Sequence, residues 1–145
     1  MILEQRELDR LRVHAEAAYP EECCAILLGK REGEVIWVSR VLPAINIHEE
    51  PTLAYEISPQ ALIAAERNAR EDGQEIVGFV HSHPDEAAKP SAQDLRDALW
   101  IGSIYGIVSV REGSFVGLNF YRLKKALEER RLVAEGMKVL NDSRG

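Results

Sequence analysis

Two short motifs near the middle of the chain carry groups that bind metals and move protons. The run His81-Ser82-His83-Pro84 is followed by Ser91-Ala92-Gln93-Asp94, so two imidazoles, a hydroxyl and a carboxylate lie within fourteen positions. Side chains alternate between the faces of a strand, so both histidines would face one ion while the serine between them faces away. Two neutral imidazoles and one carboxylate leave the fourth position of a zinc ion open for water, as in hydrolytic zinc enzymes. The sequence therefore predicts one zinc ion held by His81, His83 and Asp94, with a bound water as fourth ligand.

The composition limits the class of protein. The chain has 145 residues, 46% of them hydrophobic, and no proline- or glycine-rich linker, which indicates one domain over residues 1–145. A formal net charge of −6 argues against the basic surface that nucleic acid requires. Residues 1–6 are too charged for a signal peptide and no stretch approaches the ~18 apolar residues of a membrane span, so we expect a cytoplasmic protein without a membrane partner. The adjacent Cys23 and Cys24 cannot form a disulfide framework and fit a reducing compartment.

Hydrophobic periodicity and turn residues predict the elements that position these motifs. Helices are predicted over residues 4–19, 58–72 and 91–100, and over 123–140 within a C-terminal helix and tail of residues 121–145. Strands are predicted over residues 24–29, 34–42, 52–57, 75–83, 104–110 and 114–121. Because helices and strands mix without strict βαβ alternation, we expect an α+β fold with a mixed sheet. Strand 75–83 would deliver both histidines at its C-terminal end.

A third segment completes a resemblance to a known family. The run Glu22-Cys23-Cys24-Ala25-Ile26-Leu27-Leu28-Gly29 precedes a His-x-His pair, seven residues and Ser-x-x-Asp. This order resembles the JAMM (MPN+) zinc metallopeptidase family. The resemblance implies a single MPN domain, with a curved mixed sheet flanked by helices and a topology related to that of cytidine deaminases. It also implies that His81, His83 and Asp94 are the zinc ligands and that Glu22 is the general acid and base. For the mechanism, we expect the Ser91 hydroxyl to hydrogen-bond the oxyanion.

The pair Glu21-Glu22 offers two candidates for the base, and the residue types alone do not separate them. In the family, the glutamate stands two positions before the cysteine of a Cys-Gly-type pair. Cys24-Ala25 occupies that place here, with alanine instead of the usual glycine, so the resemblance favours Glu22.

The resemblance also suggests a substrate. Only six residues separate Pro84 from Ser91, which is similar to the compact prokaryotic members rather than to the deubiquitinating members with long insertions. Those compact members process small ubiquitin-like or sulfur-carrier proteins with glycine-rich C-terminal tails. We therefore expect hydrolysis of a peptide or isopeptide bond at such a tail by a metal-activated water.

Two other functions and one other substrate class fit the sequence less well. A catalytically silent scaffold of the same fold would lack the metal ligands, whereas this chain has all of them. A zinc deaminase would need a later Pro-Cys-x-x-Cys motif, which is missing. A small peptide or a cell-wall crosslink is the competing substrate. The sequence leaves open whether the chain forms a homodimer.

Several residues also have simpler structural interpretations. Ser91 to Asp94 fits a helix capping box, which can coexist with a ligand role for the aspartate. His14 fits the surface of the first helix, and His48 fits a loop. The two cysteines fit small buried hydrophobes. Asp85 and Glu86 fit an exposed loop, and residues 124–131 fit a solvated helix face, with a basic docking patch as the minority interpretation.

Overall fold

The computed structural model describes residues 1–142 and contains one eight-stranded sheet. The elements follow the chain in this order: β1 (Ile2–Glu4), α1 (Gln5–Ala18), β2 (Cys24–Glu32), β3 (Val35–Ala44), α2 (Pro59–Glu71), β4 (Glu75–Pro84), α3 (Ala92–Asp97), β5 (Ile104–Arg111), β6 (Ser114–Ala126), β7 (Glu129–Glu135) and β8 (Lys138–Leu140). The strand order is β7-β6-β5-β4-β2-β3-β1-β8. The β4–β5, β1–β3 and β1–β8 pairs are parallel and the others antiparallel, which confirms the expected α+β fold with a mixed sheet.

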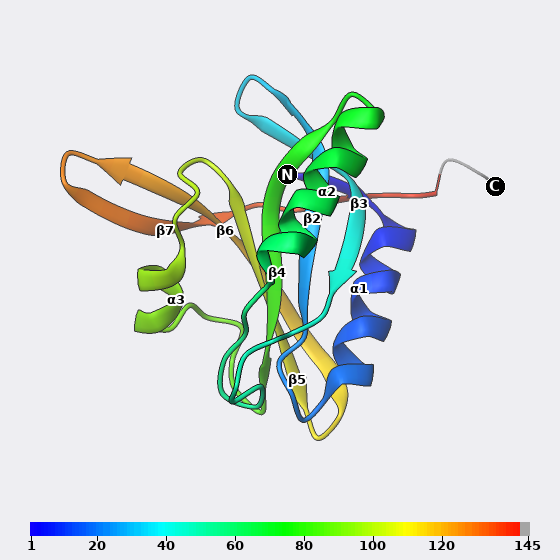
Figure 1. Ribbon diagram of the computed structural model, residues 1–145, viewed down its shortest axis with the longest axis vertical. Helices are drawn as coiled ribbons and strands as arrows, with labels where there is room; N and C mark the ends of the chain where they lie inside the picture. Colours follow the sequence, from blue (N-terminus) through cyan, green and yellow to red (C-terminus); the bar gives the residue numbers. More distant parts are fainter. Residues whose placement is uncertain (143–145) are drawn as a thin grey trace.

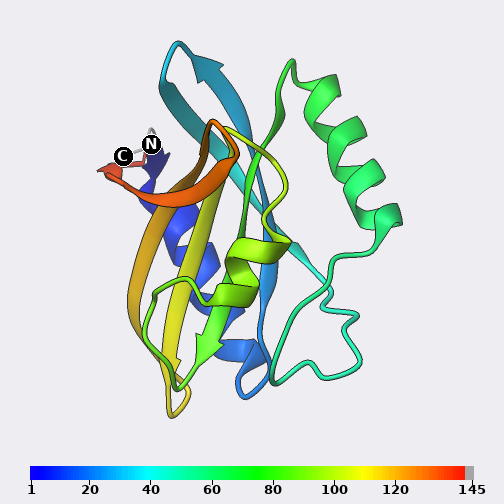
Figure 2. The same ribbon diagram turned by 90° about the vertical axis from the view of Figure 1, so that its left-hand side faces the viewer.

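The two long helices cover opposite faces of the sheet (Figures 1 and 2). Leu11 and Ala15 of α1 belong to one hydrophobic cluster, and Ala65 and Ala69 of α2 belong to another. Helix α1 touches β1 and β3 as well as β5 and β6, so the sheet curves around it. Strand β4 lies in the middle, buried on both faces from Ile76 to His83, and its two histidines project from a rigid support.

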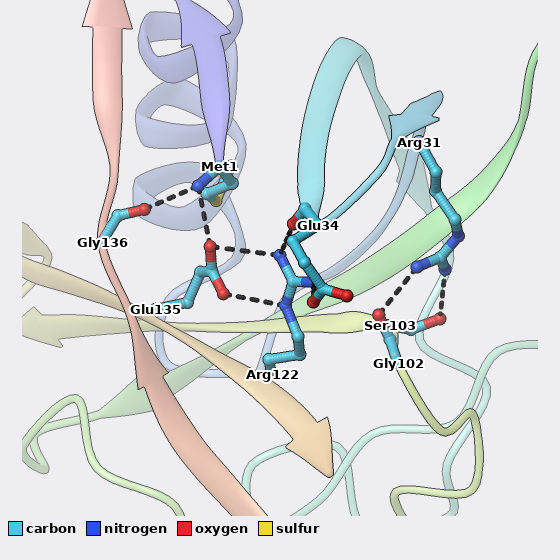
Figure 3. A network of polar contacts seen from close by, with 8 residues as sticks. All are labelled: Met1, Arg31, Glu34, Gly102, Ser103, Arg122, Glu135 and Gly136. Atoms are coloured by element: carbon cyan, nitrogen blue, oxygen red, sulfur yellow. Dashed lines mark hydrogen bonds and ion pairs between the residues drawn. The ribbon is translucent and has the colours of Figure 1, made fainter.

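An ion-pair network ties both ends of the strand order together (Figure 3). The guanidinium of Arg122 on β6 contacts Glu135 of β7 at 2.9 Å and donates to the carbonyl oxygen of Glu34 at 2.8 Å. Glu135 also accepts a hydrogen bond from the Met1 amine. Nearby, Arg31 of β2 donates separately to the carbonyl oxygen of Gly102 and to the hydroxyl of Ser103. Only Gly136 and Met137 separate β7 at one edge of the sheet from β8 at the other.

Two predicted elements are wrong. Residues 52–57 form no strand: residues 51–53 make a turn and residues 54–58 are irregular, because the loop bonds to itself and not to a neighbouring strand. The C-terminal helix is also wrong, because residues 114–135 form the β6–β7 hairpin, in which Leu123 pairs with Leu132. The charged residues 124–131 thus surround a hairpin turn at Leu127, where φ is 58°, and not a helix face. Of the predicted tail, residues 143–145 lie outside the described residues.

Smaller differences concern single boundaries and one histidine. Helix α3 ends at Asp97 and not at Trp100, because Ala98 turns to extended backbone and is buried. His14 is half-buried rather than on the surface, with Nε2 2.8 Å from the carbonyl oxygen of Cys24. The other predicted helices and strands are confirmed within a few residues. Among residues 1–142, none of the helices has the length and apolar character needed to cross a membrane.

Candidate metal centre

Three side chains converge at the C-terminal end of β4. His81 and His83 come from that strand, and Asp94 comes from α3. The histidine Nε2 atoms are 3.2 Å apart, and His81 Nε2 and His83 Nε2 lie 3.1 and 3.0 Å from the two oxygens of Asp94. Ligand atoms about 2.0–2.1 Å from a tetrahedral zinc ion lie about 3.3 Å from one another. The two nitrogens and one carboxylate oxygen, which all lie within 4.8 Å of one another, are therefore close enough to bind one ion.

The backbone fixes the tautomer of His83. Its Nδ1 lies 2.9 Å from the carbonyl oxygen of Ala87, and because that oxygen can only accept, Nδ1 carries a proton. In the neutral ring, Nε2 then holds a lone pair that faces a carboxylate oxygen of Asp94. Two acceptors 3.0 Å apart require a cation between them, either a proton or a metal ion. A second ring nitrogen held by a carbonyl is the usual support of a metal-bound histidine.

The pKa values describe a donor set that attracts a cation. Burial lowers the pKa of His81 and so favours its neutral ring. Burial also lowers the pKa of His83, but hydrogen bonds to Asp94 and Ala87 outweigh it and leave the pKa raised. For Asp94, burial raises the pKa, but hydrogen bonds from both histidines hold it far below its usual range. The aspartate is therefore an anion next to two imidazoles throughout the neutral pH range.

Glu22 lies beside these ligands in a cavity of about 240 Å³. The walls of the cavity are Glu22, Leu53, Ala54, Tyr55, His83, Glu86, Ser91, Gln93, Asp94 and Asp97. Glu22 is only 8% exposed, and burial raises the pKa of its carboxyl to about 7. A carboxyl with this pKa can both accept and return a proton near neutral pH. Glu21, the other sequence candidate, is exposed and does not line this cavity.

Ser91 begins α3 and closes a capping box, as its sequence pattern predicts. Its hydroxyl oxygen accepts from the Asp94 amide at 3.0 Å, and its own amide donates to the Asp94 carboxylate at 2.8 Å. Capping uses a lone pair of the hydroxyl, so the hydroxyl proton stays free to donate. The same carboxylate oxygen lies next to His83, so the cap and the convergence with the histidines occur together.

Side chains of β5 and β6 donate hydrogen bonds to backbone carbonyl oxygens of the loop between β4 and α3. The Ser109 hydroxyl donates to the carbonyl oxygen of Glu86 at 2.5 Å, and the Asn119 amide and the Tyr121 hydroxyl both donate to that of Ala88, at 3.0 and 2.9 Å. Ala87 lies between Glu86 and Ala88, and its carbonyl oxygen accepts the hydrogen bond from Nδ1 of His83. Side chains of β5 and β6 therefore hold the loop whose Ala87 carbonyl oxygen orients the His83 ring.

The sequence interpretation missed several residues of this centre. Tyr55 stacks on His81, with ring centroids 4.5 Å apart and an interplanar angle of 16°. Glu86 and Asp97 line the cavity, and Asn119 and Tyr121 support it from another strand. These residues follow no spacing rule, because the fold, and not the local sequence, brings them to the site.

The chain is similar to characterised and solved proteins over most of its length. The family described as prokaryotic homologs of the JAB domain matches residues 4–124. Tail tip assembly protein K of Escherichia phage N15 is 37% identical over 92 residues, which are 63% of this chain but only 34% of the phage protein, so the chain spans about a third of that relative. The desampylase of Haloferax volcanii is 31% identical over 125 residues, 83% of this chain and 88% of that protein. A probable TtuB-protein conjugate cleaving protease of Thermus thermophilus is 34% identical over 93 residues, 64% of this chain and 60% of that protein.

Solved structures agree with the fold. A solution structure of a protein from Desulfitobacterium hafniense has a TM-score of 0.85 and 29% identity, covering 99% of this chain and 96% of that one. A JAB1/MPN domain protein from Archaeoglobus fulgidus has a TM-score of 0.62 and 20% identity, covering 97% and 99%, which supports the shared fold alone.

Proposed function

Because the chain belongs to the family of prokaryotic homologues of the JAB domain, we propose that it is a zinc-dependent peptidase. Its substrate would be a peptide or isopeptide bond at the C-terminal tail of a small ubiquitin-like or sulfur-carrier protein. The observation that carries this proposal is the convergence of His81, His83 and Asp94 beside the buried carboxyl of Glu22. The names of two relatives, a desampylase and a protein-conjugate cleaving protease, support the choice of substrate.

Zinc fits this donor set of two imidazole nitrogens and one carboxylate, which leaves one corner of a tetrahedron for water or substrate. When bound, the metal supplies the Lewis acidity that polarises a water and the scissile carbonyl. The side chains of this protein supply the rest. His83 is oriented by the Ala87 carbonyl, and His81 is covered by the ring of Tyr55, so both present Nε2 to the same point.

Glu22 moves the proton in the proposed reaction. Its carboxylate takes a proton from the attacking water and then gives it to the leaving amine, which would otherwise depart as an unstable anion. The hydroxyl proton of Ser91, free because capping uses only a lone pair, donates to the oxygen that becomes negative when the carbonyl is attacked.

The size of the cavity favours a tail without side chains. Its volume of about 240 Å³ lies below the ~300–1,000 Å³ that is usual for ligand pockets. Residues 53–55 form one wall, and Gln93 to Asp97 contribute to the other. Glycine residues at the scissile bond would let the backbone approach the ligands closely.

The test is the Glu22→Gln variant with zinc present. We expect it to bind one zinc ion per chain as the parent does, since the three ligands are intact, and to lose at least about 10²-fold in cleavage rate. The assay follows release of a lysine peptide joined by an isopeptide bond to a ubiquitin-like carrier ending in Gly-Gly. Glu21→Gln is the matched control, since it makes the same change at the exposed neighbour and should cleave at the parent rate.

Two results would contradict the proposal. A Glu22→Gln protein with the parent's rate would remove Glu22 as the base. A parent protein that binds zinc but cleaves neither the carrier conjugate nor the corresponding linear fusion would favour the silent scaffold instead.

A further inference from the structure

The loop from residue 45 to residue 57 forms one wall of the catalytic cavity without belonging to any strand. It connects β3 to α2 and closes on itself through a hydrogen bond from the Ile47 amide to the Glu56 carbonyl oxygen, at 3.0 Å. It places Leu53, which is 71% exposed, and Tyr55 on the cavity. A loop with so exposed a tip needs an internal anchor to hold its shape.

The side chain of Asn46 is that anchor. Its Oδ1 accepts from the amides of His48 and Glu56, both at 3.0 Å. Its Nδ2 donates to the carbonyl oxygens of Glu22 and Ala54, also both at 3.0 Å, and lies 3.5 Å from the carbonyl oxygen of Pro51. These four bonds use the two donors and two lone pairs of the amide, and they allow only one orientation of the group.

The loop is hydrogen-bonded to both the amide and the carbonyl oxygen of Glu22. The Glu22 amide donates to the Pro51 carbonyl oxygen at 2.7 Å, and the Glu22 carbonyl oxygen accepts from Asn46. The next amide, that of Cys23, donates to the Ser82 hydroxyl on β4 at 2.7 Å. The backbone of the base is therefore fixed between the loop on one side and the strand of the histidine ligands on the other.

We propose that Asn46 is a positioning residue that sets the distance between the Glu22 carboxylate and the metal ligands, and that places the cavity wall at the same time. This inference rests on the proposed function of Glu22 as the base. Asn46 has no hydrogen bond to His81, His83 or Asp94, so its effect should fall on proton transfer and not on metal binding. A displacement of a reacting group by about 1 Å can cost about 10²-fold in rate.

The decisive variant is Asn46→Asp, which divides the four bonds into two pairs. A carboxylate still accepts from the His48 and Glu56 amides, so the internal turn of the loop is kept. It cannot donate to the carbonyl oxygens of Glu22 and Ala54 and instead repels them, so the contact with the base is lost. Asn68→Asp is the matched control, because Asn68 lies on α2 and, within residues 1–142, its side chain has one hydrogen bond, from Arg40 at 3.4 Å.

Three measurements read out the effect. Without the Nδ2 donors the loop should move away from residue 22, so the Glu22 amide should lose its bond to the Pro51 carbonyl oxygen. Hydrogen exchange by NMR should then show the Glu22 amide losing protection in Asn46→Asp, while the His48 and Glu56 amides keep theirs. Competition with a chromogenic chelator should give the parent's zinc affinity. Cleavage of the carrier conjugate at saturating zinc should show kcat reduced by about 10²-fold, whereas Asn68→Asp should match the parent in all three.

The results that overturn the inference are distinct from those that overturn the function. An Asn46→Asp protein with the parent's kcat, or one whose lost activity is restored by excess zinc, would show that Asn46 does not act through Glu22. Equal loss of protection at the Glu22, His48 and Glu56 amides would make Asn46 a general support of the loop. A parent protein without cleavage activity overturns the proposed function, and hydrogen exchange then still decides whether Asn46 holds the Glu22 backbone.

Discussion

At the scale of the residue, Ser91 caps a helix and, under the proposed function, also stabilises an oxyanion, and these two tasks can be separated experimentally. Its hydroxyl oxygen caps α3 and its hydroxyl proton is free for an oxyanion. Glycine is a tolerated N-cap that costs only a few tenths of a kcal/mol, but it has no hydroxyl. We therefore expect Ser91→Gly to lose about 10²–10³-fold in kcat with little change in the free energy of unfolding.

A second serine in the same chain provides the control for this prediction. Ser58 caps α2 in the same way, accepting from the Ala61 amide at 3.1 Å, but it does not line the catalytic cavity. Ser58→Gly should cost the same small amount of stability in urea denaturation and leave the cleavage rate unchanged. If Ser91→Gly and Ser58→Gly were equally active, Ser91 would be a cap and nothing more.

The residues that converge at the candidate site could be predicted from the sequence only where their spacing is local. His81 and His83 are two positions apart on a strand, so both side chains lie on one face, and a capping box places Asp94 near the start of its helix. Glu22 required the resemblance to the family, since Glu21 is chemically identical. Asn46 and Tyr55 could not be predicted, because their partners at Glu22 and His81 are 24 and 26 positions away and are reached only through an irregular loop.

At the scale of the element, the loop between β4 and α3 links strands β5 and β6 to His83, a proposed metal ligand. Tyr121 and Asn119 hold the Ala88 carbonyl, and the adjacent Ala87 carbonyl holds the His83 ring. Removing such outer support typically costs 10–100-fold in metal affinity. We expect Tyr121→Phe, which removes one of the two bonds to Ala88, to weaken zinc binding by about 10-fold, measured by chelator competition.

A tyrosine on the neighbouring strand serves as its control. The Tyr105 hydroxyl accepts from the Trp100 amide at 3.1 Å and has no hydrogen bond to the described residues 85–90. Tyr105→Phe should bind zinc as the parent does. Equal zinc affinity in all three proteins would mean that Asn119 alone is sufficient to hold the loop.

The elements could be predicted where burial and period agree, and could not where pairing decides. The apolar run of β4 has no competing pattern, and Ser58-Pro59 marks the start of α2. In residues 123–140, four apolar side chains at helical spacing favoured a helix. In the structure, residues 129–135 instead form β7 and pair with β6, which extends to Ala126. Cross-strand pairing therefore overrides the local helical pattern.

At the scale of the whole molecule, the sheet curves until its edge strands are joined by two residues. Glu135 closes this arrangement, since it binds the guanidinium of Arg122 and the amine of Met1 (Figure 3). Strand β1, which pairs with β3 and β8, follows directly on Met1. The candidate metal centre lies at the other end of α1 from this network, because Glu22 follows the C-terminal end of that helix. Loss of the network should therefore change stability without changing the metal site.

This separation leads to a prediction about pH. Burial raises the pKa of Glu135, but hydrogen bonds from Met1 and Arg122 outweigh it and hold the pKa below its usual 4.5. A carboxyl whose pKa is lowered by folding stabilises the folded state above its unfolded pKa, and that stability is lost as the pH falls through the folded value. We expect Glu135→Gln to reduce the free energy of unfolding of the metal-free protein by about 1.5–3 kcal/mol at pH 7, and the difference from the parent to shrink below about pH 4.

Urea denaturation at a series of pH values tests this, with Glu129→Gln as the control. The Glu129–Arg131 pair has a similar separation of 3.0 Å but is largely exposed, so its removal should change stability by less than about 1 kcal/mol at every pH. Zinc affinity should be the same in all three proteins, because neither glutamate approaches the ligands. A stability difference for Glu135→Gln that stays constant down to pH 3 would show that the carboxylate charge does not hold the sheet closed, and that the two hydrogen bonds matter only as neutral contacts.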